Sequence, residues 1–450
     1  MITYSVIQKN QLERAHRLDA EYYQPEYLKR MKRLKLFSTV KLGDIAYITD
    51  GEHGSPIFDE KSGIKYFSAQ HVRDGFIDDS EAKNISKIID EKNKRSRLKK
   101  GDVLLSTVGT IGFAGIVTED SLPANIDRHV ARIALKEKTI DPHFLVAFLN
   151  SSFGRFQTIR EATGNVQLNL FIDKIKELLV PKINNQEVSQ MIRSALQELK
   201  NSKLIYSQAE DLLLKELGLK DFKPIEDLSY IVNLSDVKSA HRTDAEYFQP
   251  KFKKIEEKLI KDFNAKRIKK LDFIKVTTGQ YSEEYTTKDQ GKPYIRGTDI
   301  TKGTVNLDNL VYIDLDRQIP SKKAKEGDVV VTRVGTIGIS ARLPKEVEGG
   351  TISDNLIRLR FSEEDLNSYY ASLYFNTIGS QLMIRESRGS VQARLNQETL
   401  KEIVLPILPK STQQKVADLV HQSHQAHKKA KELLEKAKQK IEKMILGENN

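Results

Sequence analysis

The sequence predicts an α+β protein: two tandem β-rich units, partly barrel-like and with small helices, related by a pseudo-two-fold axis and separated by two long antiparallel coiled-coil helices. Two observations predict this arrangement. The segment AHRLDAEYYQP at 15–25 returns as AHRTDAEYFQP at 240–250, with nine of eleven positions identical. In addition, each copy closes with a long helical pattern of small and apolar residues spaced alternately four and three apart.

Further matches follow in the same order in both copies. KKGDVLLSTVGTIG ends at Gly112 and KEGDVVVTRVGTIG ends at Gly338, while IREATGNVQ begins at Ile159 and IRESRGSVQ begins at Ile384. Collinear matches at a shift of 225 or 226 residues mean that the 450-residue chain is two copies of one unit. The predicted segments are the units 1–184 and 219–410 and the spacer helices 185–218 and 411–450.

The composition limits the classes of function. Lys and Arg number 73 against 62 Asp and Glu, and the resulting net charge of +11 favours an anionic partner. The absence of Cys excludes disulfides, thiolate nucleophiles and Cys-based metal sites. The longest apolar runs, such as FLVAFL at 144–149, are too short to cross a bilayer, so we expect a soluble, cytoplasmic protein.

The elements of each unit follow one order. A short apolar strand precedes the AHRxDAEY segment, and a charged helix then starts at Pro25 or Pro250, because proline suits the first helical position. The β-branched runs at 101–117 and 327–343 are each interrupted by a Gly-rich turn, which predicts a hairpin. A helix (FLVAFLNSS or YYASLYFNT), a Gly-bearing loop and a strand that ends in proline come before each spacer helix.

The two spacer helices carry equally phased seams. Small residues at every seventh seam position allow two backbones to approach closely, which suits an antiparallel pair. The alternative is that each helix packs only on its own unit. Gly218 and Gly447 follow the last seam turns as C-terminal caps. The seam residues are Val188, Ile192, Ala195, Leu199, Ser202, Tyr206, Ala209, Leu213, Val416, Val420, Ser423, His427, Ala430, Leu434, Ala437 and Ile441.

Three local patterns have both a chemical and a structural explanation. GTIG at 109–112 and 335–338 lacks the Lys of a phosphate-binding loop, so it is either a turn that approaches DNA phosphate or a purely structural turn. Three histidines stand three apart within 421–427, but no carboxylate completes a metal site. The nuclease-like pair Glu81 and Lys83 arises freely at 30% charged residues. We therefore predict no catalytic residue and no metal ligand.

Segments that recur almost unchanged should do the same job in both units. AHRxDAEYxQP is either scaffold packing or a surface that meets the same partner twice. The predicted partner-binding residues are His16, Arg17, Asp19, His241, Arg242 and Asp244.

Segments that diverge between the copies should recognise different things. DGEHGSPIFDEKSG at 50–63 and TGQYSEEYTTKDQG at 278–291 share little. These and neighbouring loops hold side chains that read base edges, although each one is also typical of a solvated loop. The predicted DNA-binding residues are His53, Ser55, Gln70, His71, Arg73, Thr107, Thr110, Asn165 and Gln167 in the first unit, and Gln280, Tyr281, Arg296, Thr298, Arg333, Thr336, Arg388, Gln392 and Arg394 in the second.

These residues resemble the DNA-specificity (S) subunits of type I restriction-modification systems. The resemblance covers essentially the whole chain. It rests on the duplicated order of a GDVLLST-type hairpin, a Gly-x-x-Gln loop (164–167 and 389–392), a strand ending LLVPKI or IVLPIL, and a long helix from Gln186 or Gln413. The family's Pro-rich, Glu-Gln entry to each helix is replaced here by Asn-Gln and Gln-Gln.

The resemblance implies two target-recognition domains that each read one half of a bipartite, asymmetric DNA site, while the helices fix the spacer. It implies a non-catalytic chain that binds two methyltransferase (modification) subunits and, with restriction (translocase/nuclease) subunits, forms an ATP-dependent nuclease. S-adenosylmethionine, ATP and Mg would belong to those partners, with no cofactor in this chain. The alternatives are a stand-alone nuclease and a two-headed basic DNA-binding scaffold without sequence preference.

Overall fold

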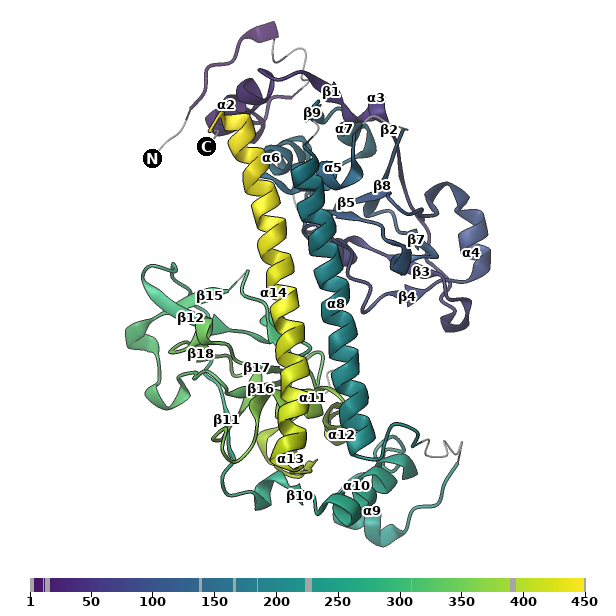
Figure 1. Cartoon of the computed structure of the whole chain (residues 1–450), viewed down its shortest axis with the longest axis vertical. Helices are drawn as coiled ribbons and strands as arrows, with labels where there is room; N and C mark the ends of the chain where they lie inside the picture. Colours follow the sequence, from purple (N-terminus) through teal and green to yellow (C-terminus); the bar gives the residue numbers. More distant parts are fainter. Residues whose placement is uncertain are drawn as a thin grey trace. The chain divides into compact units, whose positions relative to one another are not determined.

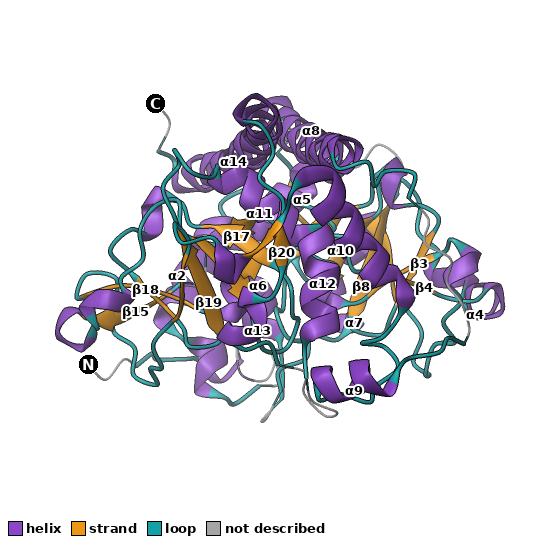
Figure 2. Cartoon of the chain, turned by 90° about the horizontal axis from the view of Figure 1, so that it is seen from below, coloured by secondary structure: helices purple, strands orange, loops and turns teal. Residues whose placement is uncertain are grey.

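The computed structural model divides the chain into two compact units. Unit 1 contains residues 1–200 and 427–450, and unit 2 contains residues 201–426. Each unit mixes helices and strands, as the sequence predicts (Figures 1 and 2). Each unit also takes part of both long helices, α8 (Gln186–Glu216) and α14 (Lys410–Leu446). The structure describes residues 4–10, 12, 17–136, 140–164, 167–183, 185–222, 229–308, 310–388 and 394–448.

Unit 1 contains three sheets, with strand orders β1-β9, β2-β8-β5-β6 and β4-β3-β7. Its strands are β1 (Thr39–Lys41), β2 (Ala46–Asp50), β3 (Lys65–Phe67), β4 (Lys83–Asn84), β5 (Val103–Ser106), β6 (Ala114–Ile116), β7 (Ala124–Ile126), β8 (Val130–Leu135) and β9 (Leu179–Pro181). Its shorter helices are α2 (Pro25–Leu34), α3 (Leu42–Ile45), α4 (Lys87–Lys92), α5 (Pro142–Asn150), α6 (Ser152–Glu161) and α7 (Ile172–Lys176).

Unit 2 repeats this topology, with strand orders β10-β20, β11-β19-β16-β17 and β15-β12-β18, and adds the small pair β13-β14. Its strands are β10 (Lys266–Arg267), β11 (Lys275–Thr278), β12 (Gly291–Ile295), β13 (Ile300–Thr301), β14 (Thr304–Val305), β15 (Val311–Asp314), β16 (Val329–Thr332), β17 (Ser340–Arg342), β18 (Thr351–Ile352), β19 (Leu356–Arg360) and β20 (Val404–Leu405). Its shorter helices are α9 (Leu234–Ala240), α10 (Pro250–Phe263), α11 (Ser368–Asn376), α12 (Ile378–Glu386) and α13 (Gln397–Lys401).

The central strand of each larger sheet is buried on both faces. In β5, Val103 and Leu105 belong to the core under the helices, whereas Leu104 points into a second core. This explains why the strand reads as a continuous apolar run rather than an alternating one. β5 pairs antiparallel with β6, and β16 pairs antiparallel with β17, so the predicted hairpins are confirmed. The described strands form open sheets and no closed barrel.

The Gly-rich turn of each hairpin is internally braced. In unit 1 the N–H of Phe113 donates to Ser106 Oγ at 3.0 Å, and in unit 2 the N–H of Ile339 donates to Thr332 Oγ1 at 3.1 Å. Gly112 has φ +79°, and a Cβ there would lie 2.1 Å from Thr158 Oγ1 of α6. Only glycine fits both the left-handed conformation and this close approach.

The short apolar strand predicted ahead of each AHRxDAEY segment does not form. Residues 4–8 and 229–233 contain no strand, and helix α9 follows the second of these segments. Tyr4, Val6 and Ile231 are exposed. These segments have apolar side chains but no neighbouring strand among the described residues to pair with, so the strand prediction was wrong.

The two long helices pack antiparallel within unit 1. Glu187 forms an ion pair with Lys440, and Glu198 forms one with Lys429 at 2.5 Å. Residues further along α8 therefore face residues earlier in α14, which is the antiparallel direction. The seam residues of this part are buried: Val188, Ile192, Ala195, Leu199, Ala430, Leu434, Ala437 and Ile441.

Within unit 2, a hydrogen-bonded serine pair joins the same two helices. Ser202 Oγ donates to the carbonyl of Ser423, and Ser423 Oγ donates to the carbonyl of Ser202, both at 2.8 Å. The small side chains therefore satisfy each other's polar groups at a close crossing. Ala209, Leu213, Val416 and Val420 are buried in the core of unit 2, whereas the seam residue Tyr206 is only half-buried. His427, the first seam residue of α14 that belongs to unit 1, is also half-buried.

Both long helices end at the predicted glycines. Gly218 and Gly447 have φ values of +60° and +75°, and the following N–H groups return to the carbonyls of Leu214 and Lys443. This is the six-to-one hydrogen bond of a Schellman cap, so both caps are confirmed.

Candidate nucleic-acid interface

The turn between β7 and β8 is the centre of the candidate site in unit 1. The N–H of Arg128 donates to the carbonyl of Glu52 at 3.0 Å, and the carbonyl of His129 accepts from the N–H of Thr107 at 3.0 Å. The carbonyl of Thr107 in turn accepts from the N–H of Leu170, also at 3.0 Å. Backbone hydrogen bonds therefore hold four separate segments together: residues after β2, after β5 and after β7, and the Gly-x-x-Gln loop.

Unit 2 builds the same frame. The N–H of Asp354 donates to the carbonyl of Gln280 at 3.2 Å, and the N–H of Arg333 donates to the carbonyl of Asn355 at 3.2 Å. The N–H of Leu395 donates to the carbonyl of Arg333 at 2.9 Å, and this is the third bond of the frame. The backbone bonds are thus equivalent in the two units, whereas the side chains that they carry differ.

The Gly-x-x-Gln loops are closed at their bases in both units. Thr163 and Asn169 exchange two backbone hydrogen bonds of 2.9 and 2.8 Å, and Arg388 and Arg394 exchange two of 2.9 and 2.7 Å. Asn165 and Gln392, two predicted DNA-binding residues, lie outside the described residues.

Two hollows border the unit 1 turn. One, of about 360 Å³, is lined by the predicted residues His53, Thr107 and Gln167, and the other, of about 570 Å³, by His53, Ser55, Gln70 and His71. Arg128 and His129 line both hollows. The structure therefore gathers most of the predicted DNA-binding residues of unit 1 around two residues that were not predicted.

The predicted residues of unit 1 differ in exposure. His53, Ser55, Gln70, Arg73, Thr110 and Gln167 are exposed. Thr107 and His71 are 3% and 6% exposed. The Nδ1 of His71 accepts from the N–H of Ser68 at 2.9 Å, which places this ring in the support of the loop rather than on its surface.

Three predicted residues of unit 2 use their polar groups in contacts within the unit: Gln280, Arg296 and Arg333. Gln280 donates to the carbonyl of Arg317 at 2.7 Å and accepts from the N–H of Ile319 at 3.0 Å. Arg296 forms an ion pair with Asp299 at 3.0 Å.

Arg333 also acts as a brace, because its guanidinium donates to the carbonyls of Leu395 and Asp354 at 3.2 and 3.3 Å. It thereby holds the turn and the Gly-x-x-Gln loop of unit 2 together. The remaining described candidates of this unit are exposed: Tyr281, Thr298, Thr336, Arg388 and Arg394.

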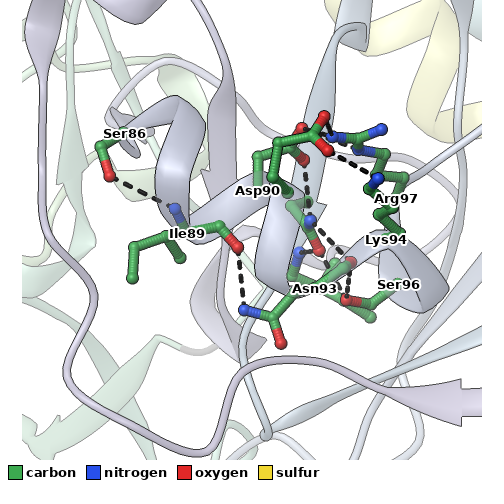
Figure 3. Close-up of polar contacts among 10 residues, drawn as sticks. Ser86, Ile89, Asp90, Asn93, Lys94, Ser96 and Arg97 are labelled. Atoms are coloured by element: carbon green, nitrogen blue, oxygen red, sulfur yellow. Dashed lines mark hydrogen bonds and ion pairs between the residues drawn. The ribbon is translucent and has the colours of Figure 1, made fainter.

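A polar network surrounds α4 of unit 1 and the short segment that follows it (Figure 3). Ser86 caps α4 by accepting from the N–H of Ile89 at 3.4 Å, and Arg97 Nε donates to Asp90 at 2.7 Å. Asn125 of β7 joins this network, since its amide donates to Asp90 at 2.9 Å and accepts from Ser96 Oγ at 2.7 Å. The network anchors the strand that leads into the turn.

The same network reaches the other side of the turn through Glu52. Asn93 donates to the Glu52 carboxylate, and this hydrogen bond lowers the pKa of Glu52. Asp127, at the start of the turn, is affected in the opposite direction, because burial raises the pKa of its carboxyl.

Sequence reasoning missed Arg128, His129 and Asn355. A signal was present: IDRHV at 126–130 occupies the place of ISDNL at 352–356, so matched strands flank three unmatched residues. Because the turn is only three residues long, it is less conspicuous than the divergent loops after β2 and β11.

The predicted partner-binding residues Arg17 and Asp19 are tied to unit 1. They form a two-point ion pair at 2.5 and 2.6 Å, and this hydrogen bonding lowers the pKa of Asp19. Arg17 and Arg160 both lie over the ring of Tyr22, at 4.9 and 3.7 Å from its centre, so the tyrosine is held by two cations.

Unit 2 repeats this arrangement. Arg242 pairs with Asp244 at 2.8 and 2.5 Å, and Arg242 and Arg385 lie 4.4 and 4.6 Å from the ring centre of Tyr247. The recurring AHRxDAEY and IRE motifs therefore contact each other, which gives their repetition a structural reason. His16 lies outside the described residues, and His241 is exposed at the end of α9. A role for these residues in partner binding stays a prediction.

The described part of the chain contains no group of three or more His, Asp or Glu side chains arranged to hold a metal ion. None of its helices combines the length and the apolar character needed to span a membrane.

Comparison with known proteins identifies the family. The family model described as "Type I restriction modification DNA specificity domain" matches twice, at residues 35–208 and 260–443. The chain therefore belongs to the type I restriction-modification DNA specificity family.

The chain is also similar to individual proteins. The type I restriction enzyme EcoBI specificity subunit of Escherichia coli is 32% identical over 157 residues, which cover 35% of this chain and only 33% of that relative's length. Among solved structures, the S subunit of a type I restriction-modification system from M. genitalium matches 91% of this chain and 95% of its own, with 13% identity and a TM-score of 0.40. The HsdS subunit from Thermoanaerobacter tengcongensis gives the same coverages with 14% identity and a TM-score of 0.28.

Proposed function

We propose that this chain is the DNA sequence-specificity subunit of a type I restriction-modification complex, in which each unit reads one half of a bipartite, asymmetric site. The observation that carries the proposal is the duplicated frame: the same backbone hydrogen bonds present Arg128 and His129 in unit 1 but Asp354 and Asn355 in unit 2. A constant frame with different side chains suits two readers of different sequences.

Charge and family membership support the same conclusion. The net charge of +11 provides the phosphate attraction on which any DNA-binding protein depends. The EcoBI relative is named as a specificity subunit, which by analogy assigns catalysis to other chains.

The partners follow from this assignment. Two methyltransferase subunits would bind this chain, because the chain itself is duplicated, and restriction subunits would complete a cytoplasmic complex. S-adenosylmethionine, ATP and Mg would be bound by those partners.

The test is selection from randomised DNA duplexes at about 150 mM salt, where phosphate-only binding is suppressed. The chain would be co-purified with the methyltransferase encoded beside it. We expect enrichment of two short, different half-sites separated by one fixed gap. A stable complex that enriches no pattern would instead indicate a basic scaffold, and metal-dependent cleavage by the pure chain would indicate a nuclease.

A further inference from the structure

Three successive residues form a chain of contacts in the β7–β8 turn of unit 1. Arg128 Nε donates to His129 Nε2 at 3.1 Å, and His129 Nδ1 lies 3.3 Å from the Asp127 carboxylate. Since Nε2 accepts a hydrogen bond, the ring proton belongs on Nδ1, which faces the carboxylate. Asp127 is fixed in turn by the N–H of His129, which donates to it at 2.8 Å.

This chain of contacts orients Arg128 without using its terminal nitrogens. Arg128 is exposed, lines both hollows, and forms no ion pair with any carboxylate of the described residues. The nearby acids have other partners: Asp50 lies 3.0 Å from Arg95, and Glu52 accepts from the N–H of Gly54 at 2.7 Å. The two terminal NH₂ groups therefore remain available on the surface.

A guanidinium with its Nε engaged presents two parallel N–H groups, which match the O6 and N7 acceptors of guanine in the major groove. We propose that Arg128 selects a guanine in the half-site of unit 1, with His129 and Asp127 as positioning residues. The proposal rests on the proposed function and adds to it a reading residue and the base class that it recognises.

Unit 2 offers a built-in comparison at the same turn. Asn355 occupies the place of His129, is exposed, and its side chain makes no hydrogen bond to any residue that the structure describes. Its amide presents an N–H donor beside a carbonyl acceptor, the pair that matches adenine N7 and N6. A change at the unit 1 turn should therefore leave the preference of the second half-site intact.

The experiment repeats the duplex selection with variants in the full complex. The wild type should enrich guanine at one position of one half-site. Arg128→Ala should reduce that preference about 10-fold to 100-fold, the range expected for loss of a bidentate base contact, and should leave the other half-site unchanged. Arg30→Ala in α2 removes the same charge elsewhere in unit 1, from a half-buried arginine that pairs with Glu26, and should leave both half-sites unchanged.

Two further variants separate reading from positioning. His129→Ala should weaken the guanine preference, whereas His129→Gln, which retains an acceptor for Arg128 Nε, should preserve a larger part of it. A structural role alone would lower binding to all duplexes in both variants and leave the base preference unmoved.

The outcomes distinguish this proposal from the proposed function. A wild type without any bipartite pattern overturns both. A bipartite pattern in which Arg128→Ala lowers binding equally on every duplex, with Arg128→Lys restoring it, makes Arg128 a phosphate contact and overturns the guanine assignment alone. A pattern that Arg128→Ala does not alter overturns it as well.

Discussion

Asn150 bonds to the outer backbone edge of β6, beside the bridge that Gly75 makes to the same strand. This residue ends α5, and its amide accepts from the N–H of Ala114 at 2.9 Å and donates to the carbonyl of Ala114 at 2.7 Å. Asn376 does the same for Ser340 in unit 2, with both distances at 2.8 Å. Both asparagines are buried, so each satisfies an edge that water does not reach.

Asn150→Ala should therefore destabilise unit 1 by about 1–3 kcal/mol, because the buried N–H of Ala114 loses its partner, whereas the carbonyl of Ala114 keeps the N–H of Gly75 at 2.9 Å. Amide hydrogen exchange should show reduced protection of β6 and unchanged protection of β17. Asn376→Ala is the matched control and should reverse the pattern. Equal protection of both strands in either variant would contradict this role.

His143 makes the stability of unit 1 depend on pH. It follows the N-cap Asp141 of α5, and its Nδ1 lies 2.8 Å from that carboxylate. Burial nevertheless lowers the pKa of His143, against the opposing effect of Asp141. The unfolded chain therefore binds a proton more readily than the folded chain, and stability declines as the pH falls below the ordinary His value of about 6.5.

This effect can be measured by denaturant unfolding at about pH 7.5 and 5.5, on either side of the ordinary His pKa. His143→Gln should reduce the difference in unfolding free energy between these two pH values. If His143→Gln and the wild type lose stability equally, His143 is not the titrating group.

At the scale of elements, the long helices approach closely because small residues occupy their seam. Ala437 is fully buried against unit 1, in the same core as Ala195. Gly75, at φ +96°, also lies against this part of α14, where an added Cβ would come within 2.5 Å of Leu434. Unit 1 therefore leaves no room for larger side chains along this part of α14.

Ala437→Leu should overpack this crossing and destabilise unit 1 by about 1–3 kcal/mol. Lys436→Leu adds the same side chain on the exposed face of α14 and should cost far less. Thermal unfolding of the two variants compares these costs directly. Equal transition temperatures would rule out a tightly packed seam.

At the scale of the whole molecule, duplication separates common from variable parts. The cation–tyrosine clusters, the hairpin braces and the edge asparagines occur in both units and hold each unit together. The turn residues and the loops after β2 and β11 differ. This division predicts that specificity is modular.

Exchanging residues 260–408 for the corresponding segment of another family member should change one half-site and leave the other intact. Selection from randomised duplexes would read both halves in one experiment. A change in both half-sites would show that the units do not read DNA independently.

The sequence by itself determined the duplication, the α+β class, the hairpins and the seam of the long helices. These features are local or periodic: a coiled-coil spacing, a β-branched run and a repeated motif each leave a pattern in neighbouring residues. The sequence also predicted where each long helix ends, because a glycine, which readily adopts φ near +60°, commonly caps the C-terminus of a helix.

Only the tertiary structure decided which polar side chains face outward. Arg333 and Gln280 have side chains of the kinds that read bases. Each donates instead to a backbone carbonyl, 62 or 37 residues away in the sequence, so both side chains support the fold of unit 2. Arg128 is the reverse case: its neighbours in space, Glu52 and Thr107, hold its turn at the surface from two other segments. A side chain's role at such a site depends on hydrogen bonds between distant segments, and these become visible only when the chain is folded.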